Sequence, residues 1–545
     1  MSEFTGGRQA NTRKIQKKLE KKLKIVYNNF VCCFGQSALL SIVIKEAFNM
    51  RASGILLHIS SLPGRYGIGK LGREAYAFAD FLAKSGQKYW QILPVTPTSY
   101  GDSPYQSFSV NAGNPYFIDF ETLEAEGLLK PMEYKRISWG GFAAVDYELL
   151  YNKVFAVLRK AFARFEPDKD YKSFCTANKD WLEDYALFMS LKDAHGGKAW
   201  DEWEKPLRMY EPKAVEAARQ DYAEDIAYYK FIQYEYFKQW RKFKAYVNGL
   251  GIDMIGDIPI YVAYDSVEVW TRPGYFLLDK DKKPIDVAGC PPDVFTAKGQ
   301  LWGNPLYRWD VMEAEGFKWW IERIRTAVST YDVVRIDHFR GFESYYTIPY
   351  GREDAVVGQW RKGLGMKLFK EVKKQLGDCR IIAEDLGFIT PKVARLLKSS
   401  GFPGMKVLEF AFDPEGDSDY LPHNFKTSNC VCYTGTHDNE TIAGWTAQLT
   451  KEEAKFTREY LNVRRNKDIP RGMIRAAWSS IADTAVAQMQ DFLELGSEAR
   501  MNIPSTLGGN WKWRMRSDAL TDELAQEIYE LTRIYRRLPQ EAVDG

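Results

Sequence analysis

The stretch VVRIDHF, at residues 333 to 339, is an apolar run that ends in an arginine, a carboxylate and an imidazole. Its valines and isoleucine are typical of a strand with both faces buried. Arg335 and Asp337 stand two residues apart, so a pleated strand places their side chains on the same face. Charged groups paired in this way at the end of a buried strand predict a functional site at that end.

Seven further apolar runs of similar length occur along the chain, three before this stretch and four after it, and segments with helical periodicity separate most of them. Buried runs without clean alternation are typical of parallel sheets covered by helices. Eight such runs predict an α/β fold of the (β/α)8 TIM barrel type. The runs lie at residues 54–60, 89–95, 253–262, 333–339, 380–386, 405–412, 430–438 and 484–490.

The connection between the second and third runs is much longer than the others. Much of it has a helical pattern, as in AEDIAYYKFIQYEYFKQWRKFKAYVNGLG at residues 223–251. No linker rich in serine, proline or glycine brackets it. We therefore expect residues 120–248 to form a large, mainly helical insertion subdomain over one face of the barrel, within a catalytic domain of residues 50–545.

Residues 1–49 precede this regular pattern. A lysine-rich segment, KIQKKLEKKLK, stands before the apolar FVCCFGQSALLSIVI at residues 30–44. The order resembles a secretion signal, but Gln36 and Ser37 interrupt the apolar part and no clear cleavage site follows. No apolar run reaches the roughly 18 residues of a membrane-spanning helix. We expect a dispensable extension, with the functional enzyme beginning near Met50.

The charges of the chain nearly cancel, with 75 basic and 72 acidic residues. This balance gives no reason to expect a nucleic-acid or anionic membrane partner, and it favours a neutral substrate. Aromatic residues make up 14% of the chain, which fits core packing and also stacking against sugar rings. Seven cysteines without CxxC spacing indicate a reducing, cytoplasmic compartment and no zinc site.

Four of the runs give way to a carboxylate at the carboxyl end of the strand, where TIM barrels form their active sites. These are Asp257, Asp337, Glu384 and Asp438. A single carboxylate at a strand end is more often a helix cap. Four at one barrel mouth repel one another, which destabilises the fold, so their presence together indicates a functional site. Paired carboxylates in an aromatic-rich cleft favour glycosidic-bond chemistry. Arg335 would keep Asp337 ionised, unless the two form only a structural ion pair.

An ordered set of motifs runs from residue 55 to residue 514: ILLHISSLPGRYGIGKLG, QILPVTPT, GDSPYQSFSVNAGNPYFID, GDIPIYVAYDSVEVW, GQLWGNPLYRW, VVRIDHFRGF, IIAEDLG, YTGTHDNET, EARMNIPST and GNWKWR. In these motifs the chain resembles the 4-alpha-glucanotransferases, the amylomaltase or disproportionating-enzyme group of glycoside hydrolase family 77. One motif alone would be weak evidence, whereas the ordered set is highly specific. The resemblance implies retaining transfer of α-1,4-glucan segments without a cofactor.

The same resemblance implies individual roles. Asp337 would be the nucleophile, Glu384 the general acid/base, and Asp438 the carboxylate that stabilises the oxocarbenium-like transition state. Arg335 and His437 would contact the sugar at the cleavage point. The implied substrates are maltodextrins and other α-1,4-glucans derived from starch or glycogen, with glucose as an acceptor.

Further sugar contacts are expected from loops at the barrel mouth. The segment GDSPYQSF offers Asp102, Ser103 and Tyr105, and the segment PPDVFTAKGQLWGNPLY offers Phe295 and Trp302. Aromatic faces can bind sugar rings and exclude water, although each of these aromatics could instead belong to the core.

Asp257 and His338 complete the predicted substrate contacts. Two roles stay open for His338, a contact to the acceptor sugar and packing behind the site. A regular pleat would turn its side chain away from Asp337, but the strand ends here and the pleat need not continue. Asp385 is expected to have a structural role. A metal site is not expected, since the chain has five histidines and the first strand offers only His58 in place of an HxH pair.

Two alternatives stay open, an α-glucan hydrolase of the α-amylase clan and a non-catalytic glucan-binding protein on a decayed barrel. Maltotriose separates them, because transfer gives glucose plus longer chains and hydrolysis gives only shorter products. A retaining pair also requires the carboxyl groups of Asp337 and Glu384 to lie about 5–5.5 Å apart. Ser505 stands where the family motif has glycine, which could shift that loop.

Overall fold

Eight short parallel strands form the inner sheet of the computed structural model, in the order β10-β11-β12-β1-β2-β3-β6-β9. One strand overlaps each of the eight apolar runs, so the predicted (β/α)8 barrel is confirmed. The strands are shorter than the runs, because most runs continue into the following loop. Their bounds are β1 (Ala52–Leu56), β2 (Tyr89–Gln91), β3 (Asp253–Ile258), β6 (Val333–Ile336), β9 (Ile381–Ala383), β10 (Gly404–Val407), β11 (Cys430–Tyr433) and β12 (Thr484–Gln488).

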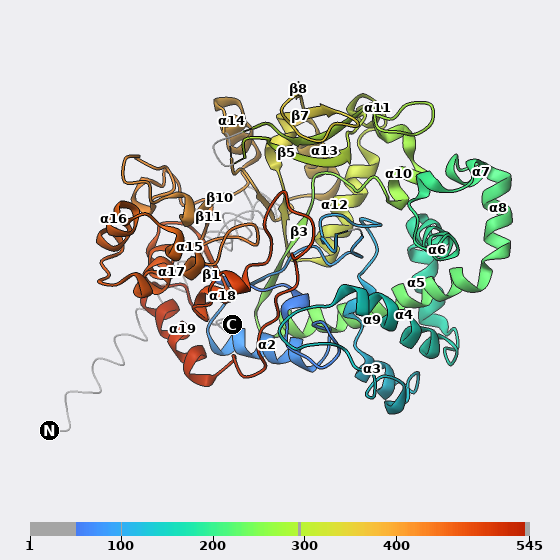
Figure 1. Cartoon of the computed structure of the whole chain (residues 1–545), viewed down its shortest axis with the longest axis horizontal. Helices are drawn as coiled ribbons and strands as arrows, with labels where there is room; N and C mark the ends of the chain where they lie inside the picture. Colours follow the sequence, from blue (N-terminus) through green and yellow to red (C-terminus); the bar gives the residue numbers. More distant parts are fainter. Residues whose placement is uncertain (1–50, 100, 293–295, 388, 540–545) are drawn as a thin grey trace, which may run out of the picture. The chain divides into compact units, whose positions relative to one another are not determined.

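The structure describes residues 51–99, 101–292, 296–387 and 389–539 (Figure 1). The chain from Ala52 onward forms one compact unit. The predicted extension, residues 1–49, lies outside the described residues, and its dispensability stays a prediction. In the described ranges, no helix is both long and apolar enough to cross a membrane.

Contacts between β9 and β10, the two ends of the strand order, complete the ring. The Ala383 N–H donates to the Pro403 carbonyl oxygen at 2.9 Å. The Asp385 carboxylate accepts the Met405 N–H at 2.7 Å. Asp385 therefore has the structural role that was predicted for it, since it joins the two strands on the side away from the site.

Helices surround the sheet, and local signals in the sequence set their ends. In α14 (Pro391–Ser400), the Thr390 side chain accepts the Val393 N–H and proline takes the first helical position. Gly401 ends this helix with a φ of 73°. The other helices after β2 and outside the long insertion are α10 (Val267–Thr271), α11 (Trp309–Ala314), α12 (Lys318–Thr330), α13 (Lys367–Leu376), α15 (Ile442–Gln448), α16 (Lys451–Leu461), α17 (Ile469–Ser479), α18 (Met489–Phe492) and α19 (Asp522–Ile534), and α2 (Arg73–Lys84) joins β1 to β2.

The long connection between β2 and β3 is mainly helical, as predicted, and Figure 1 shows its helices gathered at one side of the barrel. Its last helix, α9, has buried side chains along most of its length and leads directly into β3. The boundary of a subdomain at residues 120–248 stays a prediction. The helices are α3 (Phe120–Ala125), α4 (Tyr147–Phe162), α5 (Lys169–Ala177), α6 (Lys179–Ala194), α7 (Lys205–Arg208), α8 (Pro212–Asp221) and α9 (Ala223–Gly249).

A second, antiparallel sheet was not predicted from the sequence. Its order is β5-β4-β7-β8, and its strands come from the connections that follow β3 and β6. The sheet matters for the site because β5 carries Trp302. The bounds are β4 (Asp286–Cys290), β5 (Gln300–Pro305), β7 (Ser344–Pro349) and β8 (Gln359–Lys362).

Candidate active site

The charged side chains predicted at the ends of β6 and β9 face the barrel interior. Val333 of β6 and Ile382 of β9 belong to the apolar cluster inside the barrel. Because side chains alternate along a strand, Arg335 and Glu384, two residues further on, continue on the interior face. Asp337 follows Arg335 by the same spacing. The alternation of the strands therefore places these charged groups at the carboxyl end of the barrel, where TIM barrels hold their active sites.

Arg335 links two carboxylates. Its Nη2 lies 3.0 Å from Asp337 Oδ1, and its Nη1 donates to Asp257 Oδ2 at 2.5 Å. The Arg335 and Asp257 side chains are buried, whereas 26% of the Asp337 side chain is exposed. The guanidinium thus holds the Asp337 carboxylate at the point where it reaches the surface of the site.

Main-chain N–H groups hold Glu384. Its Oε2 accepts the N–H of His338 and its Oε1 accepts the N–H of Leu386, both at 2.7 Å. His338 can supply this donor because β6 ends at Ile336 and the His338 backbone is left-handed, with φ 49° and ψ 46°. A non-glycine residue in that region is strained, and such strain is often found at functional sites.

The pKa values of Asp337 and Glu384 lie on opposite sides of neutral. Burial raises the pKa of Asp337 to about 6, although Arg335 acts to lower it. Burial, and secondly the Asp337 charge, raise the pKa of Glu384 to about 8. The prediction that Arg335 keeps Asp337 ionised is thus too simple, because burial outweighs the guanidinium. At pH 7 Asp337 is still mainly ionised and Glu384 is mainly protonated, which suits a nucleophile and a general acid.

Asp438 lies in the loop after β11, and 44% of its side chain is exposed. Its Oδ1 accepts a hydrogen bond of 2.7 Å from Asn502, and its Oδ2 is 3.4 Å from His437 Nε2. Its carbonyl oxygen accepts from Arg500 at 2.9 Å. Asn502 and Arg500 were not singled out from the sequence, although both lie in the EARMNIPST motif.

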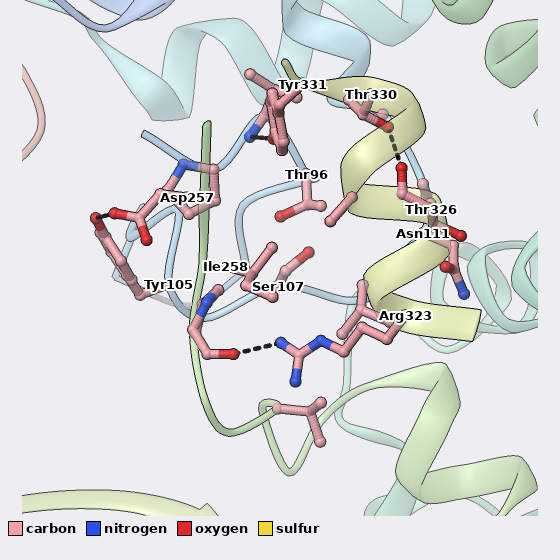
Figure 2. Close-up of a pocket in the computed structure, with 18 of the residues that line it drawn as sticks. Thr96, Tyr105, Ser107, Asn111, Asp257, Ile258, Arg323, Thr326, Thr330 and Tyr331 are labelled. Atoms are coloured by element: carbon pink, nitrogen blue, oxygen red, sulfur yellow. Dashed lines mark hydrogen bonds between the residues drawn. The ribbon is translucent and has the colours of Figure 1, made fainter. Parts of the chain in front are cut away.

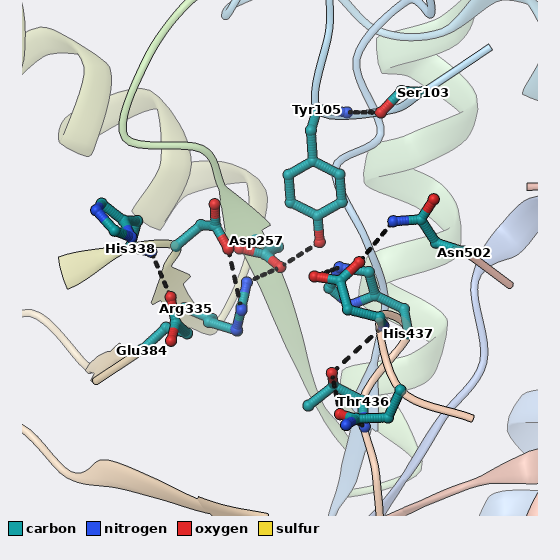
Figure 3. Close-up of polar contacts among 12 residues, drawn as sticks. Ser103, Tyr105, Asp257, Arg335, His338, Glu384, Thr436, His437 and Asn502 are labelled. Atoms are coloured by element: carbon teal, nitrogen blue, oxygen red, sulfur yellow. Dashed lines mark hydrogen bonds and ion pairs between the residues drawn. The ribbon is translucent and has the colours of Figure 1, made fainter. Parts of the chain in front are cut away.

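Three aromatic rings stand together beside these carboxylates. Tyr105 stacks on His437 with ring centroids 5.0 Å apart, and Trp511 lies 5.8 Å and 5.9 Å from these two rings. The Tyr105 hydroxyl donates to Asp257 Oδ2 at 2.8 Å. Figure 3 shows this contact together with those of Arg335. The hydroxyl thereby connects the aromatic group to the charged one.

Asp102 and Ser103 lie in the loop that follows β2, and Asp257 lies near the end of β3. Asp102 has a left-handed backbone with φ 61°, and burial raises the pKa of its carboxyl group. The Ser103 hydroxyl oxygen accepts the Tyr105 N–H at 3.2 Å. The Asp257 side chain has no exposed surface, and its contacts are with Arg335 and Tyr105. Sugar contacts by Asp102, Ser103 and Asp257 stay predictions.

Trp302 lies against His338, the residue whose N–H group binds Glu384. Their rings meet edge to face, with centroids 4.7 Å apart, and Trp302 Nε1 donates to the Gln300 side chain at 3.0 Å. Burial lowers the pKa of His338 to about 3, so its ring is neutral. The predicted contact Phe295 lies outside the described residues.

Two further features bear on the sequence predictions. Within the described ranges, His, Cys, Asp and Glu side chains form no group of three or more that could hold a metal ion. Ser505 has a φ of 63°, a conformation that favours the glycine expected there.

Comparison with known proteins connects this geometry to a family. The family model described as 4-alpha-glucanotransferase matches residues 57–521. The chain belongs to the 4-alpha-glucanotransferase family. The 4-alpha-glucanotransferase of Clostridium butyricum is 49% identical over 486 residues, which cover 88% of this chain and 100% of that protein. That of Thermus thermophilus is 47% identical over 502 residues, which cover 90% and 99%.

Solved structures of related enzymes agree with this membership. An amylomaltase from Streptococcus agalactiae, in complex with acarbose, matches with a TM-score of 0.88 and 46% identity, over 90% of this chain and 100% of that one. The amylomaltase of Corynebacterium glutamicum matches with a TM-score of 0.72 at 17% identity, over 91% of this chain and 76% of that one, and shows the fold alone. The predicted enzyme class, a glycosyltransferase of the 4-alpha-glucanotransferase type, is confirmed.

Proposed function

We propose that this 4-alpha-glucanotransferase works with retention of configuration, through a covalent glycosyl intermediate on Asp337. The observation that carries the proposal is the way the two carboxyl groups are held at the barrel mouth, Asp337 by Arg335 at 3.0 Å and Glu384 by the main-chain N–H groups of His338 and Leu386 at 2.7 Å. Burial raises both pKa values, that of Asp337 to about 6 and that of Glu384 to about 8. Two carboxyl groups with different protonation states at neutral pH are what a nucleophile and an acid/base require.

In the first step the Asp337 carboxylate attacks the anomeric carbon of the donor glucan. The bond from that carbon to the leaving 4-oxygen breaks, and Glu384 gives its proton to this oxygen. Asp438, close to His437 and held by Asn502, would stabilise the positive charge that develops on the sugar. Arg335 holds Asp337 in place for the attack.

In the second step the 4-hydroxyl of an acceptor attacks the same carbon. Its proton passes to the now ionised Glu384, and the bond to Asp337 breaks. One α-1,4 bond is replaced by another, so the two steps are chemically balanced without a cofactor.

The proposed substrates are neutral glucan chains. Donors would be maltodextrins and other α-1,4-glucans from starch or glycogen, and acceptors would be the same chains or glucose. The rings of Tyr105 and Trp302 are partly exposed at the site and could stack on sugars. The cytoplasmic location stays a prediction.

Incubation with maltotriose tests the transfer. The expected products are glucose and a series of longer chains, resolved by chromatography. Only shorter products would identify a hydrolase, and unchanged maltotriose together with measurable binding would identify a glucan-binding protein. Asp337→Asn should abolish turnover while the circular dichroism spectrum stays that of the wild type, and retention of full activity would refute the assigned nucleophile.

A further inference from the structure

Arg500 connects the two segments that carry Asp438 and Asn502. It lies in the segment that follows α18, whereas Asp438 lies in the loop after β11. Its Nη2 donates to the Asp438 carbonyl oxygen at 2.9 Å, and its Nε donates to the Asn502 carbonyl oxygen at 2.8 Å. The Asn502 side chain in turn donates to the Asp438 carboxylate, a contact that Figure 3 shows. One guanidinium thus holds both the main chain of Asp438 and the residue that orients its carboxylate.

Glu440 is the third partner of this guanidinium. Its Oε2 lies 3.5 Å from Arg500 Nη1 and accepts a hydrogen bond of 3.1 Å from the Gln448 side chain. Its Oε1 accepts the Thr441 N–H at 2.9 Å. The Glu440 side chain is 9% exposed. The carboxylate is therefore held by neighbours on its own loop and helix, and it holds Arg500 in turn.

Another buried arginine shows that the charge of Glu440 needs its own explanation. Arg323 of α12 donates to the carbonyl oxygens of Pro259 and Ile260, which follow β3, and to the Tyr307 hydroxyl. Figure 2 shows its side chain directed at the segment after β3. A guanidinium can thus hold a segment at the barrel mouth through neutral oxygens, whereas at Arg500 a carboxylate takes one of the places.

The charge of Glu440 also costs stability through a buried neighbour. Burial, and as a smaller cause the Glu440 charge, raise the pKa of Asp491 to about 6. Like charges that lie close together in a buried place repel one another. A carboxylate that is retained at residue 440 against this repulsion indicates a functional role.

Gly444 leaves room for the Glu440 carboxylate. It lies in the first turn of α15, and a Cβ atom at this position would lie 2.6 Å from Glu440 Oε1 and 2.6 Å from the Ser497 hydroxyl oxygen. Alanine is normally the better residue inside a helix. The glycine therefore indicates that the carboxylate has to stand in this place.

We propose that Glu440 is a positioning residue for Asp438 and that it acts through Arg500. The carboxylate holds the guanidinium in the orientation that reaches both carbonyl oxygens, so that Asp438 and Asn502 keep their places while the glucan reacts. The role rests on the proposed function, in which Asp438 stabilises the positive charge that develops on the sugar.

Glu440→Gln tests the role with almost no change in side-chain size. Both carboxylate oxygens accept hydrogen bonds, Oε2 from Arg500 and Gln448 and Oε1 from Thr441. An amide in either orientation sets its NH2 group against one of these donors. We expect kcat for maltotriose to fall about tenfold without a change in KM, because the transition state, more than the bound chain, needs Asp438 in place.

Glu133→Gln is the matched control. Glu133 also accepts a main-chain N–H, that of Lys130 at 2.8 Å, and pairs with the Arg164 guanidinium at 2.7 Å. All three residues belong to the long connection between β2 and β3. This substitution should lower Tm and leave kcat unchanged. Equal losses of kcat in the two variants would overturn the positioning role.

A double variant separates positioning from a general loss of structure. Glu440→Gln and Asn502→Ala both release Asp438, so their combination should lose little more kcat than the worse of the two single variants. All rates are measured well below the Tm of each variant. Losses that multiply would show that the two residues act independently and would overturn the positioning role.

Arg500→Lys and Gly444→Ala keep the role testable if Glu440→Gln does not fold. An ammonium group does not reach three acceptors as the planar guanidinium does, and a methyl group at residue 444 comes too close to the Glu440 carboxylate. Both variants should lower kcat at unchanged KM, and a wild-type kcat in either would overturn the role. Asp438→Ala distinguishes this failure from that of the proposed function, because wild-type activity there would refute the role of Asp438 itself and that of Glu440 with it.

Discussion

The clearest quantitative consequence of the site is its dependence on pH. The proposed mechanism needs Asp337 ionised, so activity should be lost as pH falls through its pKa of about 6. It also needs Glu384 protonated, so activity is lost as pH rises through its pKa of about 8. The value of kcat/KM should therefore form a bell with its maximum near pH 7.

The size of the loss follows from the same two values. One pH unit below the pKa of Asp337, about a tenth of the carboxyl groups are ionised, and one unit above that of Glu384 about a tenth are protonated. We expect kcat/KM at pH 5 and at pH 9 to be roughly a tenth of the maximum.

The assay is the initial rate of glucose release from dilute maltotriose between pH 4.5 and pH 9.5 at constant ionic strength. Samples held at each pH and then assayed at pH 7 show whether the enzyme has unfolded. A rate that keeps rising from pH 7 to pH 9, or an acid limb well below pH 5, would refute the assigned protonation states.

Three further predictions follow from contacts around the barrel. Asn502→Ala removes the hydrogen bond that orients the half-exposed Asp438 side chain, worth about 1 kcal/mol, so kcat should fall about fivefold in the maltotriose assay, and a wild-type rate would contradict the positioning role of Asn502. Arg537→Ala removes a buried guanidinium that donates to five carbonyl oxygens near the ends of β1, α17 and β12, and should destabilise the fold by about 3 kcal/mol or more in urea unfolding. The exposed Arg533→Ala is its control and should cost about 1 kcal/mol or less. A crystal structure with a bound glucan should place the carboxyl groups of Asp337 and Glu384 about 5–5.5 Å apart, and a separation above about 7 Å would argue against retention.

The barrel could be predicted because its strands are buried on both faces and so appear as continuous apolar runs. The second sheet gives no such signal. In β5, Gln300–Pro305, exposure varies along a short strand that contains glycine and ends in proline. The sheet also forms only because β4 pairs with β7, which follows a different strand of the barrel. Pairing of that kind depends on tertiary contacts that a local pattern does not contain.

The carboxylates of the site could be predicted because each ends an apolar run. Asn502 and Arg500 could not be distinguished from other polar loop residues, since only the folded loop brings them to Asp438. The left-handed backbone of His338 could not be predicted either, because nothing in the sequence requires that conformation of a histidine. The pKa of Asp337 depends on how deeply the site is buried, which a sequence does not give.

Main-chain groups hold Glu384, and this affects which neighbouring residues can be substituted during evolution. Both of its oxygens are bound by the main-chain N–H groups of His338 and Leu386, and every residue type except proline supplies such a donor. The side chains at these two positions are therefore free to vary while the proton donor keeps its place. Selection, in nature or in the laboratory, can change the side chain at residue 338 without moving the Glu384 carboxyl group, provided that the left-handed turn is retained.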